Sequence, residues 1–393
     1  MDTVTTTPSV QLWPNLFRQL VITNSRHWLN CAQNDPEHFA QETSQVLRAL
    51  NYGLPLPEAW ESVRDLIIHL SPLMIRRGQG IEWEPYLLQG IKRSTEQQDP
   101  AEIKFRLHLG NLYRLQGRLP EAHDTLQTGV NLCGHYDTQT HYWALLNLLA
   151  LVARLSGHHE EALAHCQKAL DTSQSSMAER AEAWNVKGLV AHDQRKWEAA
   201  LNYFDQAIDL YHFTNNNFEK ARTLSNRGMI LRRLSRNKEA QETYRMSIDL
   251  FQSLGDKLEV NKPITNLGNL YLTKKDYNSA ITYYIKALSA FQECNYVVDL
   301  AHIYNNLGMA HTGLSNWAIA EEYYTASINA WKNTDNKYSL VNVLDNFGEM
   351  FVKAQQSHRA HEIWRQANQI LQEAADDPRK THLQQVLNKR LEK

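Results

Sequence analysis

The stretch at residues 258–288, LEVNKPITNLGNLYLTKKDYNSAITYYIKAL, contains a pattern that recurs along the chain. Its marks are Gly268, Ala280 and Tyr284. The same marks stand forty residues later at Gly308, Ala320 and Tyr324, and forty residues earlier at Gly228, Ala240 and Tyr244. Repetition at a fixed period predicts a tandem array in which each repeat packs against its neighbours.

Two recurring positions give the number of repeats. A small residue stands at Gly110, Ala150, Gly188, Gly228, Gly268, Gly308 and Gly348. An alanine follows each of them twelve residues later, at Ala122, Ala162, Ala200, Ala240, Ala280, Ala320 and Ala360. Successive marks are 40 residues apart except for one step of 38, so the pattern predicts seven helical hairpins. Small residues at both marks let the two helices of a hairpin approach closely, and the larger residue at the Tyr284 position fills the space above them.

The segments outside the array are also predicted to be helical. From Leu12 to about Leu29, after Pro57 and after Gly80, apolar residues recur at helical spacing. We expect a flexible N-terminus at residues 1–10 and a helical N-terminal region with a degenerate repeat at 11–96. The seven repeats then occupy 97–376, and an amphipathic helix at 377–393 caps the last apolar surface.

Composition excludes several functional classes. The 393 residues carry a formal charge of −2, which gives no overall attraction to nucleic acid or membrane. The four cysteines are far apart and form no CxxC pair, so neither a disulfide framework nor a zinc ribbon is predicted. No segment approaches the roughly 20 apolar residues of a membrane span, and we expect a cytoplasmic protein.

The recurring small residue, alanine and aromatic residue resemble the tetratricopeptide repeat family over residues 99–375. This resemblance implies an all-α fold, a right-handed superhelical solenoid of about seven hairpins whose first helices line a concave groove. The chain departs from the family in its forty-residue period, where 34 is usual, and in lacking the family's closing proline. That place is taken by Gly134, Gln174, His212, Gln252, Gln292, Lys332 and Gln372. We therefore expect second helices that run a turn or more longer than usual.

The sequence contains no convincing catalytic or metal signature. The best metal candidate is the run His158-His159-Glu160-Glu161 with His165 and Cys166, which is not HExxH and spans a repeat turn. Neighbouring positions on one helix do not supply the convergent geometry that a metal needs. We predict a non-enzymatic protein with no catalytic residues, no metal site and no cofactor.

The groove implied by the resemblance is predicted to be basic in its middle. Its basic residues are Arg154 from the second repeat, Arg222, Arg232 and Arg233 from the fourth, and Lys262 from the fifth. Several positive charges in a partly walled groove raise the local potential and favour an acidic partner segment. Solvated charge on an outer helix face is the alternative explanation for such a cluster.

A row of asparagines is the second candidate feature of the groove. Asn226, Asn266, Asn306 and Asn346 each stand two residues before the small residue, and Asn269 stands one residue after it. Asparagine amides can hold the main chain of an extended peptide with paired donors and acceptors. They can equally bond to the neighbouring helix and keep the repeats in register.

These features predict a protein interaction scaffold that binds a peptide or protein segment in its groove. One alternative is a peptide-sensing regulator, because a helical N-terminal unit followed by forty-residue repeats is similar in layout to the Rap-type quorum-sensing family. Another is the regulatory subunit of a separately encoded enzyme, such as a protease or an NTPase.

Overall fold

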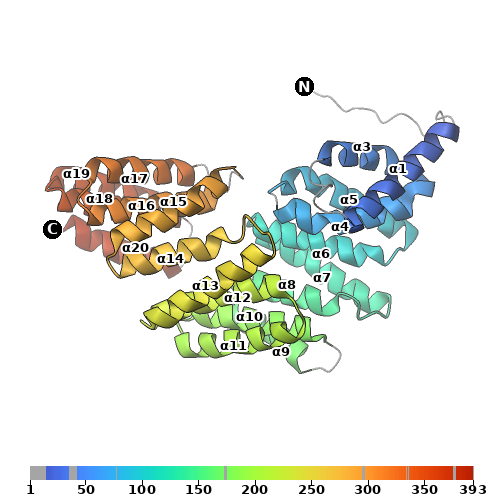
Figure 1. Ribbon diagram of the computed structural model, residues 1–393, viewed down its shortest axis with the longest axis horizontal. Helices are drawn as coiled ribbons and strands as arrows, with labels where there is room; N and C mark the ends of the chain where they lie inside the picture. The colour runs from blue at the N-terminus through green and yellow to red at the C-terminus, as the bar shows by residue number, and fades with distance from the viewer. Residues whose placement is uncertain are drawn as a thin grey trace. The chain divides into compact units, whose positions relative to one another are not determined.

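A computed structural model gives the fold of this chain. It describes residues 15–34, 42–76, 78–171, 175–293, 297–332, 334, 336–374 and 378–392. The expected flexible N-terminus at residues 1–10 lies outside these described residues. Every regular element within them is a helix, and the predicted all-α fold is thereby confirmed (Figure 1).

The chain divides into two compact units, Met1–Glu179 and Arg180–Lys393. Unit 1 holds α1 (Asn15–Asn34), α3 (Thr43–Gly53), η2 (Pro57–Ala59), α4 (Trp60–Arg76), α5 (Gly80–Gln97), α6 (Ala101–Leu115), α7 (Leu119–His135), α8 (Tyr142–Leu155) and α9 (His159–Leu170). The next helix, α10 (Met177–Asp193), begins at the end of unit 1 and continues in unit 2. Unit 2 further holds α11 (Trp197–Phe213), α12 (Asn217–Arg233), α13 (Asn237–Ser253), α14 (Asn261–Thr273), α15 (Tyr277–Glu293), α16 (Val297–Gly313), α17 (Trp317–Lys332), α18 (Lys337–Lys353), α19 (Ser357–Gln372) and α20 (Pro378–Leu391).

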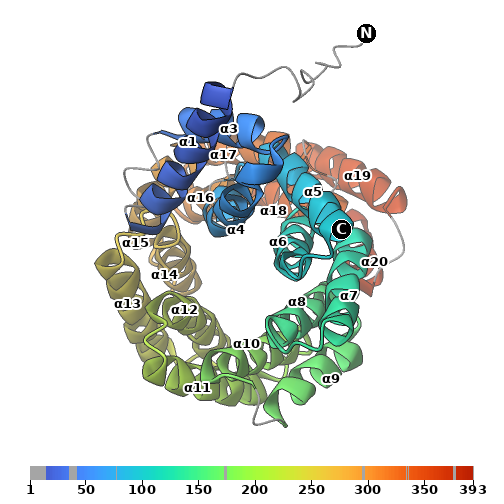
Figure 2. The same cartoon turned by 90° about the vertical axis from the view of Figure 1, so that its right-hand side faces the viewer.

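The seven predicted hairpins are the consecutive helix pairs from α6 and α7 to α18 and α19. Successive first helices also contact one another, as α12 contacts α14 and α14 contacts α16. In unit 2 these first helices form one layer, and the second helices α11, α13 and α15 form the other (Figure 2). Residues at the same position of successive first helices therefore come side by side.

One turn geometry closes all seven hairpins. A residue with positive φ follows each first helix, at Gly117, Gly157, Arg195, Ser235, Lys275, Ser315 and Gln355. The next backbone N–H then bonds to a carbonyl five residues earlier, as Asp276 N does to Tyr271 O at 3.0 Å. This is the Schellman end of a helix, which satisfies carbonyls that the helix itself leaves without partners.

The core of each hairpin is a side chain of the second helix pressed against the small residue of the first. A Cβ added to Gly268 would lie 2.6 Å from Cε1 of Tyr284, and one added to Gly308 would lie 2.9 Å from Cδ1 of Tyr324. Both rings are buried, and all seven alanine marks are fully buried as well. The recurring marks of the sequence are thus the contacts that hold the two helices of a hairpin together.

Six of the second helices have 16 or 17 residues, as the missing proline predicts, whereas α9 has 12 and ends at Leu170. His212, Gln252 and Gln372 occupy the place of that proline and lie inside α11, α13 and α19. The apolar residue before each of them is buried, at Tyr211, Phe251 and Leu371. The extra turn therefore adds an apolar contact to these repeats.

The last helix, α20, covers apolar surface at the C-terminal end of the array. Leu383 and Leu387 are buried in one cluster with Trp364 and Leu371 of α19. The Arg390 guanidinium holds α20 to α18 through an ion pair with Asp345 at 3.2 Å.

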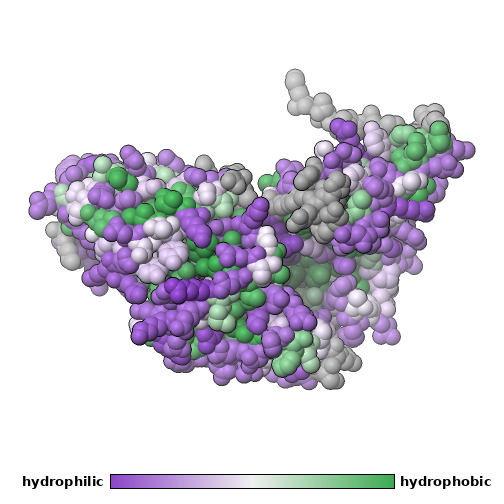
Figure 3. All heavy atoms as spheres, viewed as in Figure 1, coloured by the Kyte–Doolittle hydropathy of each residue, from purple (hydrophilic) through white to green (hydrophobic). Residues whose placement is uncertain are grey.

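The outer surface agrees with amphipathic helices whose apolar sides face inward. Hydrophilic residues cover most of the face of unit 2 seen in Figure 3, with smaller hydrophobic areas between them. None of the described helices combines the length and the apolar character needed to cross a membrane.

Replacing Gly268 by alanine should destabilise the protein by about 1 to 3 kcal/mol, because the new methyl group meets the buried Tyr284 ring. The matched control is Gly134→Ala in α7, where a Cβ meets no atom within 4 Å. Alanine is the better helix former, so the control should be neutral or gain up to about 1 kcal/mol. Urea unfolding of the two variants measures both effects, and equal losses would contradict the assigned register.

Removing residues 378–393 should make the chain self-associate, because it exposes the apolar surface that Leu383 and Leu387 cover. Sedimentation velocity should show a species that grows with concentration. Removing only residues 392–393, beyond the end of α20, is the control and should leave sedimentation unchanged. A shortened chain that sediments and melts like the full chain would show that α20 is a tail.

Candidate functional site

Six of the ten predicted groove residues line one pocket in unit 2, of about 490 Å³. They are Arg222 and Asn226 of α12, Lys262, Asn266 and Asn269 of α14, and Asn306 of α16. Its polar lining also includes Glu259, Asp299, His302, Ser225 and Thr265, and Phe251 and Phe291 supply apolar wall. Three successive first helices therefore contribute the same positions to one cavity.

The asparagine row bonds across the repeats. The Asn306 amide donates to Asn269 Oδ1 at 2.9 Å, and the Asn266 amide donates to Ser225 Oγ at 3.1 Å. The Asn346 amide makes the same kind of bond, to Asn305 at 3.1 Å, although Asn346 does not line the pocket. Each amide thus bonds its helix to the preceding first helix. This is the contact expected if the asparagines keep the repeats in register.

An acidic row runs beside the asparagines. Glu219, Glu259 and Asp299 each stand nine residues before the glycine of their repeat. The residues three positions later are Arg222, Lys262 and His302, one helical turn further along. Spacing of three residues brings Glu219 beside Arg222 and Glu259 beside Lys262.

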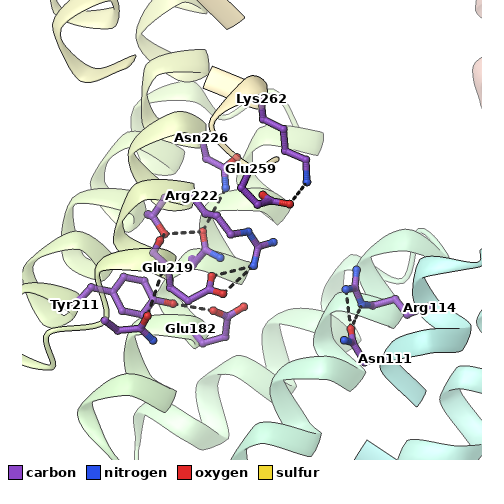
Figure 4. A network of polar contacts seen from close by, with 12 residues as sticks. Asn111, Arg114, Glu182, Tyr211, Glu219, Arg222, Asn226, Glu259 and Lys262 are labelled. Atoms are coloured by element: carbon purple, nitrogen blue, oxygen red, sulfur yellow. Dashed lines mark hydrogen bonds and ion pairs between the residues drawn. The ribbon is translucent and has the colours of Figure 1, made fainter. Parts of the chain in front are cut away.

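The first of these pairs belongs to a polar network (Figure 4). Arg222 Nη1 donates to both carboxylate oxygens of Glu219, each at 2.9 Å, and the Tyr211 hydroxyl donates to Glu182 at 2.7 Å. The fold places Glu219 at the start of α12, where its N–H bonds to the side chain of the capping residue Asn216. Local capping therefore sets the position of this carboxylate.

The charges of the network shift its titrations. Burial raises the pKa of the Glu219 carboxyl, Arg222 opposes that rise, and Glu182 adds to it. The Arg222 side chain is 46% exposed, and the part of it that is buried in the pocket would by itself lower its pKa. The surrounding carboxylates, Glu219 first, nevertheless hold the pKa of Arg222 above its usual value.

The second pair is an ion pair like the first, and the third pair differs from both. Lys262 Nζ lies 2.8 Å from Glu259, in a direct ion pair (Figure 4). Burial raises the pKa of Asp299 above 3.8, while Lys262 and His302 pull it back in part. Burial also lowers the pKa of His302 below 6.5, so its imidazole is neutral at pH 7.

The remaining predicted basic residues do not line this pocket. Arg232 donates to Thr273 at 3.3 Å, and the exposed Arg233 has its pKa lowered by partial burial and then by Arg232. Arg154 belongs to unit 1. The basic middle expected from the sequence is therefore divided, with Arg222 and Lys262 in the pocket and each paired to a carboxylate.

The acidic row could have been predicted from the sequence, although counting basic residues alone does not reveal it. Glu219, Glu259 and Asp299 recur at the forty-residue period, as the asparagines do. Reading that position together with the one three residues later would have shown each cation beside its counter-ion.

The histidine-rich run of α9 forms side-chain pairs. His158 and His165 lie 3.5 Å and 3.7 Å from Glu161, and Cys166 is buried at its place in the hairpin core. Within the part of the chain that the structure describes, no three His, Cys, Asp or Glu side chains converge as metal ligands would.

Sequence profiles of the tetratricopeptide repeat match residues 140–212, 179–253 and 219–293, and a related profile matches 300–334. These segments are tetratricopeptide repeats. The pocket residues from Arg222 to Asn306 all fall within or between them. No curated protein sequence matches this chain.

Several solved structures share the fold at low sequence identity. A Rap protein complexed with Competence and Sporulation Factor is similar over 90% of this chain and 98% of its own, at 14% identity and a TM-score of 0.57. NprR in complex with its cognate peptide NprX is similar over 73% of this chain and 82% of its own, at 15% identity and a TM-score of 0.54. The APC/C hetero-tetramer Cut9-Hcn1 is similar over 96% of this chain and 70% of its own, at 15% identity and a TM-score of 0.58. At these identities the likeness shows the fold alone.

Replacing Asp299 by asparagine should stabilise the repeats at pH 7. Because burial raises the pKa of Asp299, the stability that its protonated form contributes is fully present below pH 3.8 and is lost as the pH rises through the raised pKa. Asparagine cannot ionise, so the advantage of Asp299→Asn should shrink as the pH falls toward 3.8. Urea unfolding at pH 7, 5.5 and 4.5 measures this trend. Asp249→Asn on the exposed face of α13 is the control, and a constant difference across pH would contradict the assignment.

Proposed function

We propose that this protein is a non-enzymatic interaction module that holds a segment of a peptide or protein in the pocket of α12, α14 and α16. The observation that carries this proposal is the convergence of matching polar positions from three successive repeats on one cavity of about 490 Å³. A cavity of that size takes a few residues of an extended chain, and small-molecule and peptide sites share this mixture of apolar wall and few polar groups.

The asparagines have capacity left for a partner. An amide offers two N–H donors and an oxygen that accepts twice. The bonds of Asn226, Asn266 and Asn306 to the preceding repeat each use one N–H. The two roles considered for this row are therefore compatible, because the inter-repeat bond orients the amide and leaves its other groups for a peptide main chain.

The charges favour a partner segment with a basic residue. Glu182, Glu219, Glu259 and Asp299 lie in or beside the pocket, against the two permanent cations Arg222 and Lys262. Both cations are already paired, and burial raises the pKa of Glu219 and of Asp299, so the ionised carboxylates would gain from a further positive charge. An ammonium or guanidinium group entering the pocket would supply it. We therefore propose a basic partner segment in place of the acidic one that the count of arginines favoured.

A peptide-sensing regulator is the more specific form of this function. Among the similar structures, NprR is in complex with its cognate peptide NprX and a Rap protein is complexed with Competence and Sporulation Factor, and both proteins share this fold. The likeness covers 90% of this chain in the Rap case, which is more than the seven repeats alone.

Selection from a random heptapeptide library displayed on phage tests the proposal. Binders should be enriched in lysine or arginine, and fluorescence polarisation of a selected peptide gives its Kd. Replacing its basic residue by glutamine should weaken binding about tenfold, as for a lost charged hydrogen bond. Enrichment in aspartate or glutamate would contradict the charge assignment.

The repeat supplies a matched pair of variants for this assay. Asn266→Ala and Asn346→Ala each remove one inter-repeat amide bond from the same repeat position, and only Asn266 lines the pocket. Both should cost about 1 kcal/mol of stability. Only Asn266→Ala should weaken the peptide, by about fivefold or more. Equal affinities for the two variants would place the peptide elsewhere.

A further inference from the structure

Unit 1 contains a second pocket, of about 630 Å³, that the asparagine row does not reach. It lies between α4, the start of α6 and the loop that joins α7 to α8. Ile68 and Ile103 give it apolar wall, and Lys104 and His141 are among its polar lining. It thus combines the two kinds of surface that small-molecule sites use.

The loop of this pocket is held in an unusual backbone conformation. Asp137 and His141 have φ of 47° and 65°, in the left-handed region that side chains with a Cβ rarely adopt. Local bonds fix the loop, since Thr138 N donates to Cys133 O at 2.9 Å and Thr140 N donates to Thr138 Oγ1 at 3.1 Å. The His141 imidazole is therefore presented to the pocket by a segment that is already ordered.

Most charges of this pocket are paired within it. Arg64 lies 2.8 Å from Asp65 and 3.0 Å from Asp99, and the Trp60 indole also donates to Asp99, at 3.3 Å. Arg64 thus contacts both carboxylates, one positive charge against two negative ones, and its guanidinium has no free charge to offer.

Lys104 is the exception, and its place in the repeat explains why. It stands six residues before Gly110, the position that Arg222 and Lys262 hold in their own repeats. Those two cations pair with an acid three residues earlier, but the corresponding residue here is Ala101. The adjacent Glu102 pairs with Arg106 at 2.6 Å, and Lys104 has no carboxylate within 4.0 Å among the described residues. The ammonium group thus lines the pocket without a counter-ion.

We propose that this pocket binds a small organic anion, with its carboxylate or phosphate group on Lys104 and His141 and its apolar body against Ile68 and Ile103. The ammonium supplies the missing charge pair, and the imidazole donates one hydrogen bond. Burial and the nearby Lys104 charge lower the pKa of His141, so its ring acts as a neutral donor. This site is independent of the peptide pocket in unit 2.

Calorimetric titration of the full chain with benzoate and with phenyl phosphate tests the proposal. The two probes share an aromatic body and differ in the anion, and saturable binding of either one supports the site and identifies the preferred group. Lys104→Gln should weaken binding about tenfold or more, and Lys104→Arg should retain it because the charge remains. The matched control is Lys92→Gln on the exposed face of α5, which should bind as the unmodified chain does.

A second variant separates the site from a general charge effect. His141→Asn keeps a residue that tolerates left-handed backbone and should weaken binding without loss of helix content by circular dichroism. The proposal is overturned if neither probe binds saturably up to 10 mM, on the order of ten times the weakest affinity expected for a specific site. It is equally overturned if Lys104→Gln binds as tightly as the unmodified chain.

Discussion

The contact between a small residue on each first helix and a large side chain on its partner is the constraint on which this structure depends. At Gly268 and Gly308 the ring of the second helix occupies the volume that a Cβ would need. The two helices can then pack closely, and the same closeness recurs in every repeat because the marks recur. Successive first helices consequently lie in register, and residues forty positions apart become neighbours.

Because of that register, residues that occupy the same position in successive repeats form continuous rows. An asparagine on one first helix reaches the preceding one, as Asn306 reaches Asn269, so the row stabilises the arrangement that creates it. The acidic row follows a different rule, since Glu219 and Glu259 each pair with a cation three residues later in the same repeat. One row therefore binds repeat to repeat, and the other sets the local charge of each repeat. Residues of both rows, from the repeats of α12, α14 and α16, line or lie beside the pocket.

The sequence predicted the helical hairpins well, because every one of them depends on contacts at a fixed spacing. It also brought Arg222, Asn226 and Lys262 to one pocket, since their positions follow from the repeat alone. It did not predict that Arg222 would be paired, because counting cations ignores the carboxylate one turn earlier. The placement of Arg232 beside Thr273 likewise depends on how the next first helix packs, which the spacing of one repeat does not contain.

The turns that close the hairpins differ between the two units, and this difference affects how the array opens. In unit 1 the left-handed position is glycine at both Gly117 and Gly157, whereas in unit 2 it is occupied by Arg195, Ser235, Lys275, Ser315 and Gln355. A left-handed residue with a Cβ costs about 1 to 2 kcal/mol. Because a repeat contacts only its neighbours, that cost weakens each hairpin of unit 2 where it stands. Single hairpins there should open more readily than those of unit 1, and a bound segment that touches three of them would make them open and close together.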